Sequence, residues 1–358
     1  MARIALFEPY YGGSHRSFID GLTRLPHQFQ LHTLPANRWK WRMRLAAPFW
    51  AEEIRRGKID LSGVDTILCS SYLDVAAFKG LLPAAFAAIP IRVYFHENQF
   101  AYPVREEDPR DLHFALTNLT TALAADRVAF NSRYNLESFL AGCRELLGNG
   151  GDMGLGDYQE RIRAKARILE PGLDVTEIDR QAAHAQTTNP VPVIVWNHRW
   201  EHDKDPDLFF TTLFDLHAQG VPFRLMVMGE AFRERPAIFA RARELLADRI
   251  DHFGHLPSRA AYLATLSQAD IVVSTARHEF FGLSVLEAVR AGCRPLVPRR
   301  LVYPELFGPE ALYDDHELTE RLRAMLGQGR LPRAQALKLT ERFAWQQLLP
   351  HFGEWLTG

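Results

Sequence analysis

Short apolar runs rich in β-branched and aromatic residues alternate with segments of helical periodicity along the whole chain. The first half contains the runs RIALF, TILCS, IRVYF and RVAFN, and the second half contains VPVIVW, FRLMVMG, DIVVSTA and RPLVP. This alternation is typical of parallel strands joined by crossover helices. The sequence therefore predicts an α/β fold, and the ligands of such folds bind beyond the carboxyl ends of the strands.

The chain is long enough for two domains. It has 358 residues, and 47% of them are hydrophobic, which is enough for two cores. Apolar periodicity is lost over residues 174–190, where small polar residues collect. We predict a Rossmann-like domain at 1–175, a linker at 176–190 and a second Rossmann-like domain at 191–342, with parallel sheets facing an interdomain cleft.

Composition excludes several classes of protein. The formal net charge is −1, which argues against a protein that coats nucleic acid, so any RNA contact must come from a local patch. Cys69, Cys143 and Cys293 are far apart and lack C-x-x-C spacing, so we expect neither a disulfide framework nor a zinc site. No leader sequence and no apolar run long enough to span a bilayer is evident. We therefore expect a cytoplasmic protein without a membrane association.

Two strand ends in the first half carry candidate ligand-binding residues. Gly12 and Gly13 follow RIALF at the start of a helical segment, where glycines let backbone N–H groups approach an anion or a sugar. An ordinary tight turn explains them equally well. His96 follows IRVYF and precedes Glu97, and we predict that it projects from the strand end toward a ligand.

A loop in the second half has the charge expected of a diphosphate site. Arg199 and Lys204 lie between the run VIVW and the next helical segment, and an arginine fork with a lysine point charge suits a diphosphate. A solvated charged loop is the alternative. The sequence Asp205-Pro206-Asp207 resembles an Asp-x-Asp metal motif, but we interpret Asp205 as a helix N-cap with Pro206 in the first helical position.

The segment STARHEFFGLSVLEAVRAGCRPLV combines two carboxylates with a turn. Glu279 ends a loop, and the backbone N–H groups of Phe281, Gly282 and Leu283 are candidates for phosphate contacts at the start of a helix. Glu287 lies on that helix, where its carboxylate is placed to accept hydrogen bonds from two ribose hydroxyls.

Several segments together resemble one family closely. The sequence resembles the tRNA-queuosine alpha-mannosyltransferases, within the retaining GT-B glycosyltransferases, in EPYYGGSHRSF, LPANRWKWRMR, YFHENQFAYPV, FNSRYNLESF, WNHRWEHDKDP, STARHEFFGLSVLEA and LVYPELF. The resemblance covers nearly the whole chain. It implies a GT-B fold, and an amphipathic C-terminal helix at 343–358 that packs back on the first domain.

The resemblance also implies an activity. A member of this family would be a hexosyltransferase that moves mannose from GDP-mannose to the cyclopentenediol of queuosine in the anticodon of tRNA-Asp. The donor and the queuosine-containing tRNA are then its partners, no metal or other cofactor is expected, and no protein partner is implied. The leaving phosphate oxygen itself would take the proton from the attacking hydroxyl, so no protein nucleophile is needed.

Residue roles follow from the positions that match the family. Arg199 and Lys204 would hold the donor diphosphate, Glu279 would meet the transferred sugar, and Glu287 would bind the ribose. His198 stands where the wider group has a glycine, which changes the backbone beside the diphosphate. The remaining matches are His96 beside the sugar, Gly12 and Gly13 near phosphate and acceptor, Phe281, Gly282 and Leu283 at the donor phosphate, and Gly229 and Gly254 near the nucleotide base.

Residues 38–44, RWKWRMR, form a basic and aromatic segment in a nearly neutral chain. If the segment is extended, its cations lie on one face and its tryptophans on the other; if it is helical, they share faces, and a stacking or membrane surface becomes possible. The sequence leaves both open. With the family match, we predict acceptor tRNA contacts by Arg38, Lys40, Arg42, Arg44 and His15.

Two other functions compete with this hypothesis. One is a GT-B transferase that uses another nucleotide sugar on a glycan or lipid acceptor, and its mark would be an amphipathic basic helix. The other is a catalytically inactive RNA-binding protein of the same fold. The presence of Arg199, Lys204, Glu279 and Glu287 together argues against an inactive protein.

Overall fold

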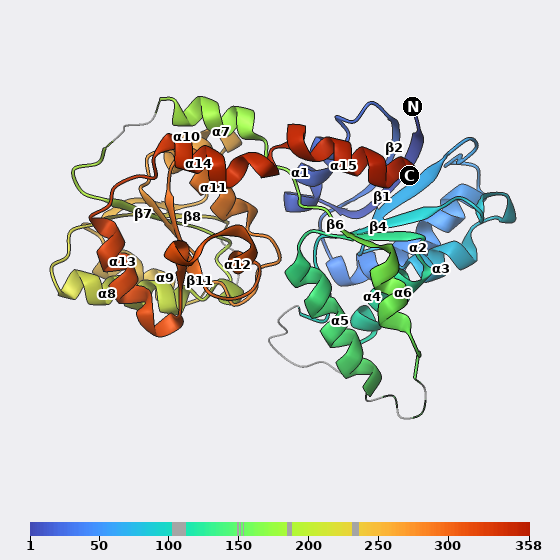
Figure 1. The fold of residues 1–358 in the computed structure, drawn as a ribbon, viewed down its shortest axis with the longest axis horizontal. Coiled ribbons are helices and arrows are strands. Elements are labelled where there is room, and N and C mark those ends of the chain that lie inside the picture. Colours follow the sequence, from blue (N-terminus) through green and yellow to red (C-terminus); the bar gives the residue numbers. More distant parts are fainter. Residues whose placement is uncertain (102–111, 149, 151, 153, 185–187, 231–235) are drawn as a thin grey trace. The chain divides into compact units, whose positions relative to one another are not determined.

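A computed structural model gives the fold of the chain as two compact units (Figure 1). The first unit comprises Met1–Gly172 and Trp345–Gly358, and the second comprises Leu173–Ala344. The structure describes residues 1–101, 112–148, 150, 152, 154–184, 188–230 and 236–358.

The first unit is built on a six-stranded parallel sheet in the order β2-β1-β3-β4-β5-β6. Its chain direction across the sheet reverses between β1 and β3, which is where a doubly wound fold binds ligands. The strands are β1 (Arg3–Tyr11), β2 (Gln28–Pro35), β3 (Thr66–Ser70), β4 (Ile91–Phe95), β5 (Arg127–Phe130) and β6 (Ala166–Ile168).

Helices cover both faces of this sheet, as expected for strands buried on both sides. One face packs against α1 and α15, and the other packs mainly against α2 to α6. The helices are α1 (Gly13–Leu22), α2 (Trp39–Arg55), α3 (Val75–Leu81), η1 (Ala84–Phe86), α4 (Leu112–Ala124), α5 (Arg133–Gly148), α6 (Tyr158–Lys165) and α15 (Trp345–Thr357).

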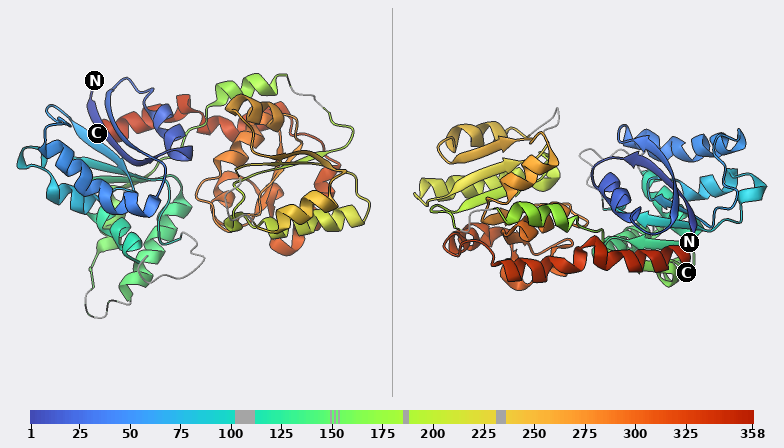
Figure 2. Two further views of the ribbon diagram at one scale, coloured as in Figure 1. Left: turned by 180° about the vertical axis from the view of Figure 1, so that it is seen from behind. Right: turned by 90° about the horizontal axis from the view of Figure 1, so that it is seen from above.

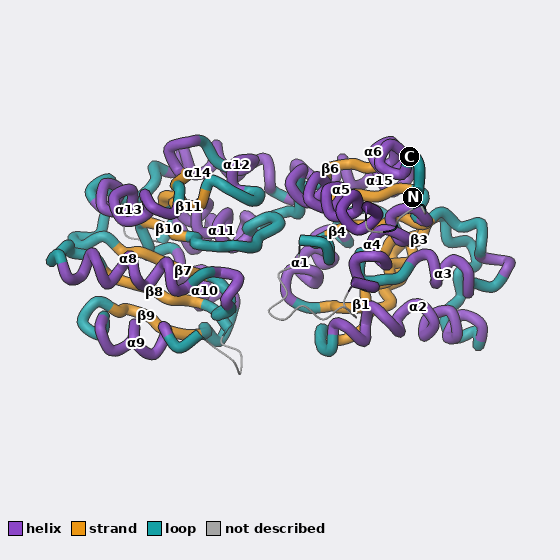
Figure 3. The backbone as a smooth tube through the Cα atoms, turned by 90° about the horizontal axis from the view of Figure 1, so that it is seen from below, coloured by secondary structure: helices purple, strands orange, loops and turns teal. Residues whose placement is uncertain are grey.

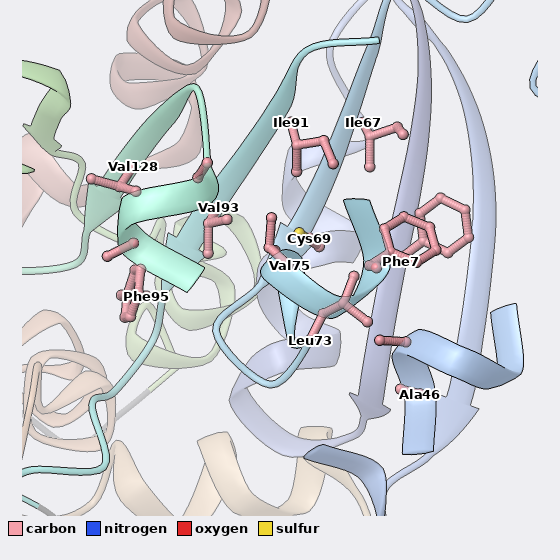
Figure 4. Close-up of a cluster of buried hydrophobic side chains, with 14 of the residues drawn as sticks. Phe7, Ala46, Ile67, Cys69, Leu73, Val75, Ile91, Val93, Phe95 and Val128 are labelled. Atoms are coloured by element: carbon pink, nitrogen blue, oxygen red, sulfur yellow. The ribbon is translucent and has the colours of Figure 1, made fainter. Parts of the chain in front are cut away.

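The core on the α2 to α6 side is continuous across the strands. Figure 4 shows Phe7 of β1, Ile67 and Cys69 of β3, and Val93 of β4 meeting Val75 of α3. All of these side chains are at most 1% exposed. Alternate residues of the same strands point to the other face, so each strand contributes to both cores.

The chain returns at its end to the first unit. Trp345 of α15 packs so closely on Gly21 and Gly172 that a Cβ atom at either glycine would overlap its indole ring. Figure 2 shows both chain termini within this unit. Because α15 belongs to the core of the first unit, this unit is built from two separate stretches of sequence.

The second unit contains another six-stranded parallel sheet, in the order β12-β11-β10-β7-β8-β9. Here the direction reverses between β7 and β10. The strands are β7 (Val193–Asn197), β8 (Arg224–Met228), β9 (Ile250–Gly254), β10 (Ile271–Val273), β11 (Arg294–Pro298) and β12 (Leu312–Tyr313).

Helices flank the strands in this unit too (Figure 3). The long ones are α7 (Val175–Ala182), α8 (Pro206–Ala218), α9 (Ile238–Leu245), α10 (Arg259–Leu266), α11 (Leu283–Ala291), α13 (Leu318–Leu326) and α14 (Arg333–Thr340). The short ones are η3 (His202–Lys204), α12 (Tyr303–Leu306), η4 (Pro309–Ala311), η5 (Asp315–Glu317) and η6 (Glu341–Phe343).

The structure differs from the predicted linker at 176–190. Most of its first half is α7, which is part of the second unit, and residues 185–187 lie outside the described residues. Asp179 of α7 is 2.6 Å from guanidinium nitrogens of both Arg290 and Arg333. The helix buries Val175 and Ile178 on one face, and its ion pairs with Arg290 and Arg333 attach it to the second unit.

All three cysteines are buried and unpaired with one another in the described structure. Within the described residues, no helix is both long enough and apolar enough to cross a membrane.

Candidate active site

The predicted donor residues come together where the strand order of the second unit reverses. Arg199 and Lys204 follow β7, and Glu279 follows the neighbouring strand β10. The carboxyl ends of these two parallel strands lie at the same edge of the sheet, so two loops 75 residues apart in sequence bring Lys204 and Glu279 into contact.

Lys204 is a buried cation held by three oxygens. Its Nζ donates to the carbonyl oxygen of His278 at 2.6 Å, and lies 3.1 Å from the Asp203 carboxylate and 3.4 Å from the Glu279 carboxylate. Burial lowers the pKa of Lys204, but the charges of Glu279 and Asp203 outweigh it, so the pKa is raised. Lys204 therefore stays charged in a setting where desolvation strengthens its field.

Glu279 uses one carboxylate oxygen to fix the turn that follows it. Its Oε1 accepts hydrogen bonds from the backbone N–H groups of Phe281 at 3.4 Å and Gly282 at 3.1 Å. Two of the three backbone donors predicted for a phosphate are thus engaged by Glu279 in this structure. Gly282 has φ of 84°, a left-handed conformation that favours glycine, and it caps α11. Although burial raises the pKa of Glu279, Lys204 and the neighbouring histidines hold it below its usual value.

Arg199 is more accessible than Lys204. Its side chain is 48% exposed and its guanidinium lies 3.1 Å from the Glu201 carboxylate. The two cations predicted to bind the diphosphate therefore differ. Lys204 is buried and held by three oxygens, whereas the Arg199 side chain is half exposed on the same loop.

His198, which replaces the glycine of the wider group, is buried at 4% exposure. Its ring contacts Trp196 edge-on at 5.2 Å, and its Nε2 has no hydrogen-bond partner within the described part of the chain. Burial, with the charge of Lys204, lowers the pKa of His198 to about 4. The extra side chain is accommodated in the interior as a neutral imidazole.

The start of α8 confirms the interpretation of Asp205 and Pro206. Asp205 is the N-cap and accepts from the backbone N–H of Leu208 at 3.2 Å, and Pro206 opens the helix. Asp205 also accepts from Arg277 at 2.6 Å, which ties the loop after β7 to the loop after β10. This aspartate is therefore used structurally.

Glu287 is held by two side chains that our sequence analysis did not identify. Arg259 lies 2.5 Å from its Oε1, and the Tyr262 hydroxyl donates to its Oε2 at 3.1 Å. The same hydroxyl accepts from Asn197 at the end of β7 at 3.0 Å. Arg259 and Tyr262 lie on α10 and reach Glu287 only through the tertiary fold, and no local motif marks them.

Gly229 and Gly254, predicted near the base, close the ends of β8 and β9. Both have positive φ, at 139° and 140°, and the Gly229 N–H lies 3.4 Å from the Gly254 carbonyl oxygen. A Cβ at Gly229 would overlap the carbonyl oxygen of His198. Glycine at 229 therefore lets the loop carrying Arg199 pack against the end of β8.

In the first unit, Gly12 and Gly13 form the turn between β1 and α1. Gly13 has φ of 52°, in the left-handed region, whereas Gly12 is extended and would overlap Ala36 if it carried a Cβ. His96 follows β4 and is partly exposed. These residues end strands β1 and β4 of the same sheet, as predicted.

The structure places His15, which we predicted to contact the acceptor tRNA, in the interior of the first unit. His15 is 4% exposed, its Nδ1 lies 3.2 Å from the buried Glu8 carboxylate, and its ring stacks on His96 at 4.1 Å. The cause is the amphipathicity of α1. Its first turn directs His15 toward the sheet, where the Glu8 carboxylate lies.

Glu8, His15 and His96 are also the one group of potential metal ligands that the described residues bring together. One ligand atom from each lies within 4.8 Å of the others. However, the two imidazoles stack with only 28° between their planes, so their faces rather than their ring nitrogens are directed at each other. This arrangement fits an ion pair with a stacked imidazole better than a metal centre.

Residues 38–44 are helical, which settles the alternative left open by the sequence. Arg38 caps α2 in a left-handed conformation, with φ of 51°. Met43 is buried, whereas Trp41 is 58% exposed and Arg44 lies over its ring at 5.9 Å. The extended arrangement, with cations and tryptophans on opposite faces, is wrong.

The cations of residues 38–58 fall into two groups. The amino-terminal group is Arg38, Lys40, Arg42 and Arg44, and the carboxyl-terminal group is Arg55, Arg56 and Lys58. Arg55, Arg56 and Lys58 are paired with Glu52 and Glu53.

In the amino-terminal group, Arg42 and Arg44 donate to groups other than carboxylates. Arg42 donates to the Pro35 carbonyl and the Asn37 side chain, and Arg44 donates to His113 at 3.1 Å. Lys40 lies 5.6 Å from the centre of the Trp39 ring. Within the described residues, neither Arg42 nor Arg44 is therefore paired with a carboxylate.

A surface pocket of about 440 Å³ lies between the end of α1 and α15. None of the predicted site residues lines it; its lining residues are Arg24, Leu25, Pro26, His27, Gln346, Leu349, Pro350, Gly353, Glu354 and Thr357.

Comparison with known proteins identifies the family. Residues 3–173 match the family described as tRNA-queuosine alpha-mannosyltransferase N-terminal, and residues 177–335 match glycosyl transferases group 1. A tRNA-queuosine alpha-mannosyltransferase from Drosophila melanogaster is 37% identical over 363 aligned residues, covering 98% of this chain and 95% of the relative. The chain belongs to the tRNA-queuosine alpha-mannosyltransferase family.

More distant similarities support the fold. A GDP-mannose:cellobiosyl-diphosphopolyprenol alpha-mannosyltransferase from Xanthomonas campestris is 27% identical over 40% of this chain and 37% of that protein. The structure of sucrose-phosphate synthase from Thermosynechococcus elongatus aligns over 99% of this chain and 98% of that one, with a TM-score of 0.67 and 16% identity. An E. coli trehalose-6-phosphate protein bound with UDP-2-fluoro glucose aligns over 99% of each chain with a TM-score of 0.68 and 12% identity. The fold of this family member is GT-B, as the sequence predicts.

Proposed function

We propose that this chain transfers mannose from GDP-mannose to the cyclopentenediol of queuosine in the anticodon of tRNA-Asp, with retention of configuration. The relationship to the Drosophila protein, over 98% of the chain, carries this proposal. The site supports it, because the residues expected to hold a nucleotide diphosphate and a sugar converge at the reversal point of the second unit.

The donor would lie against the ends of β7 and β10. Arg199 and Lys204 then bind the diphosphate, and Glu279, 3.4 Å from Lys204, meets the sugar. Glu287 binds the ribose hydroxyls. Its carboxylate oxygens already accept from Arg259 and Tyr262, but a carboxylate has about four acceptor positions, so two remain for a ribose.

The reaction needs electrostatic stabilisation more than a protein nucleophile. The bond between the sugar carbon and the phosphate oxygen breaks, the acceptor hydroxyl forms its bond on the same face, and its proton passes to the leaving phosphate oxygen. Negative charge grows on the diphosphate, and a buried lysine with an adjacent arginine stabilises it without reorganisation of solvent.

We expect these side-chain cations to replace a metal ion. Asp205 of the Asp-x-Asp sequence is engaged in capping α8 and in pairing with Arg277. Transfer in the presence of a chelator at the wild-type rate would agree with this expectation, and dependence on added Mg²⁺ or Mn²⁺ would contradict it.

The start of α2 supports an RNA acceptor. Exposed Trp41 beside Arg44, with Arg38 and Arg42 nearby, combines a stacking surface with groups that bind phosphate. Lys40 belongs to the same turn of helix. We propose that these four cations contact the tRNA backbone, and that the enzyme acts in the cytoplasm.

The similarity to the Xanthomonas protein favours one second candidate, a lipid-linked saccharide acceptor. Exposed Trp41, Leu45 and Phe49 at four-residue spacing on α2 would also suit a membrane surface. The similarity of residues 3–173 to the queuosine family favours the tRNA.

The test is a transfer assay with purified protein and GDP-mannose. Three acceptors are compared: tRNA-Asp containing queuosine, the same tRNA with guanine in that position, and a polyprenyl-diphosphate-linked saccharide. We expect GDP release and a hexose mass increase of the queuosine nucleoside with the first acceptor alone. Equal activity on both tRNAs, transfer to the lipid acceptor, or no transfer to any of the three would overturn the proposal.

A further inference from the structure

Glu8, His15 and His96 form an array that runs from the interior to the surface of the first unit. Glu8, on β1, is 1% exposed, His15, on α1, is 4% exposed, and His96, after β4, is partly exposed. The Glu8 carboxylate lies 3.2 Å from His15 Nδ1, and the two imidazoles stack at 4.1 Å. Only His96 is placed to meet a ligand.

The inner end of the array is fixed. Glu8 Oε1 accepts from the Tyr10 N–H at 2.8 Å and from the Ser70 hydroxyl at 3.2 Å, so Oε2 is directed to His15. The ring centroids of Tyr10 and Tyr72 lie 6.1 and 5.2 Å from that of His15, and both pairs are T-shaped. This packing leaves the His15 ring a single orientation.

The outer ring is fixed as well. The ring centroids of Phe18 and Tyr94 lie 4.8 and 4.7 Å from that of His96, with angles of 89° and 69° between the ring planes. The third ring in contact with His96 is the stacked His15. The orientation of His96 therefore depends directly on the side chain behind it.

Charge in the array is divided unequally. Two stacked imidazoles repel each other if both are protonated, so the pair holds one proton more readily than two. Burial lowers the pKa of His15, but the negative charge of the adjacent Glu8, helped by Glu97, raises it overall. Burial and the charge of His15 hold the pKa of His96 well below its usual value. His15 is thus the protonated member and His96 the neutral one.

We propose that His15, held by Glu8, is a positioning residue that fixes the His96 ring and keeps it a neutral imidazole, so that its ring nitrogen can accept a hydrogen bond from a hydroxyl of the sugar or acceptor. The inference rests on the proposed function, in which His96 lies beside the sugar. Among the described residues, the titratable groups that face the array are Glu97, Tyr10, Tyr72 and Tyr94.

The first test needs no substrate. In the full-length protein, the ring protons or ring nitrogens of His96 are followed by NMR from pH 4 to pH 8, with assignment by His96→Gln. We expect His15→Asn to raise the pH at which His96 titrates, because the neighbouring positive charge is gone, and Glu8→Gln to raise it to a smaller extent. Exposed His351→Gln is the matched control and should leave the His96 titration unchanged.

The second test uses turnover. His15→Asn should lower kcat, by roughly 10²-fold if His96 loses its place, with a donor KM close to wild type and an acid limb of kcat moved to higher pH. A merely structural role would lower stability or protein yield and leave the pH profile of the remaining activity unchanged. If His15→Asn does not fold, Glu8→Gln, which keeps the side-chain shape, provides the same two measurements.

The outcomes separate the two proposals. A His96 titration that is the same in wild type, His15→Asn and Glu8→Gln overturns the positioning role. A shifted titration in a protein that mannosylates no queuosine-containing tRNA supports the coupling of the two histidines and overturns the proposed function.

Discussion

At the scale of single residues, Arg199 and Lys204, the two cations of the proposed donor site, are expected to differ when replaced. Arg199 is 48% exposed, so Arg199→Ala removes a charge without disturbing the interior. Lys204 is buried between Asp203 and Glu279, so replacing Lys204 also leaves these two carboxylates without the cation that they pair with. Equal loss of activity from the two variants would therefore have different causes.

We predict that Arg199→Ala and Lys204→Ala each lower kcat by about 10²- to 10³-fold, as is typical for the loss of one charge-stabilising group. Arg199→Ala should keep the wild-type melting temperature, and Lys204→Ala should melt lower. Turnover and thermal unfolding, measured on the same preparations, check both statements. Wild-type turnover in either variant would exclude its role at the diphosphate.

Glu287 is predicted to act on donor binding. Hydrogen bonds to a charged group contribute about 1.5–3 kcal/mol, so Glu287→Ala should raise the donor KM by roughly 10- to 100-fold. Tyr262→Phe, which removes one of the groups holding Glu287, should have a smaller effect in the same direction. A donor KM unchanged in Glu287→Ala would contradict the ribose role.

The lowered pKa of buried His198 predicts that the free energy of unfolding depends on pH. Its pKa falls from 6.5 to about 4 in the folded protein, which corresponds to about 3 kcal/mol. The unfolded chain therefore takes up this proton at higher pH than the folded chain. The contribution is fully present above pH 6.5 and is lost as the pH falls toward 4.

In His198→Gln the free energy of unfolding should thus decrease less between pH 7 and pH 4.5 than in wild type. Urea unfolding at the two pH values measures this difference. His351→Gln, at an exposed position, serves as the control with a wild-type slope. An unaltered slope in His198→Gln would mean that the buried imidazole does not titrate as its surroundings indicate.

At the scale of elements, α2 shows why charge must be counted together with its partners. Its sequence region from 38 to 58 holds seven cations and two glutamates. Both glutamates pair with the last three cations, whereas the hydrogen-bond partners of Arg42 and Arg44 are not carboxylates. The arginines of this one region therefore differ in whether a described carboxylate offsets their charge.

We predict that Arg42→Glu with Arg44→Glu raises the KM for tRNA and leaves the donor KM unchanged, with an effect that becomes smaller at high salt. Arg55→Glu with Arg56→Glu, at positions that pair with glutamates in the same region, is the matched control and should change the KM for tRNA less. The measurement is initial velocity against tRNA concentration at low and high salt. The same KM in both double variants would show that α2 does not bind the acceptor through Arg42 and Arg44.

At the scale of the whole molecule, the last helix completes the first unit. The side chains that α15 buries there include Trp345, Leu348, Phe352 and Trp355. Gly21 of α1 and Gly172 provide the space for the Trp345 ring. Residues more than 300 positions apart are therefore needed for one core.

We predict that Trp345→Ala destabilises the protein by about 3–5 kcal/mol, as is usual for a large buried aromatic side chain. Gly21→Ala should also destabilise it, since the added Cβ overlaps the Trp345 ring. Gly353→Ala is the control, because its nearest neighbour would be Leu25 at an ordinary 3.5 Å. Urea unfolding distinguishes these variants, and an equal free energy of unfolding for Gly21→Ala and Gly353→Ala would contradict the packing.

Local chemistry made the elements and many site residues predictable. Short apolar runs that are buried on both sheet faces define the central strands. Asp205 before Pro206 marks a helix start without reference to anything distant. Arg199, Lys204, Glu279 and Glu287 were recognisable because each lies beside such a local feature. Part of the segment predicted as a linker, 176–190, is instead α7, whose ion pairs with Arg290 and Arg333 lie far along the chain and leave no local signal.

The sequence by itself determined the α/β class, the two strand series, the family and the residues that end the strands. Only the tertiary structure decided which of these residues meet: Lys204 with Glu279, Glu287 with Arg259 and Tyr262, and Glu8 with His15. It also decided that Arg55 and Arg56 pair with glutamates whereas Arg42 and Arg44 bond to groups other than carboxylates. The physical reason is that charge, burial and hydrogen bonding depend on distances between side chains, and those distances are set by packing across the sheets.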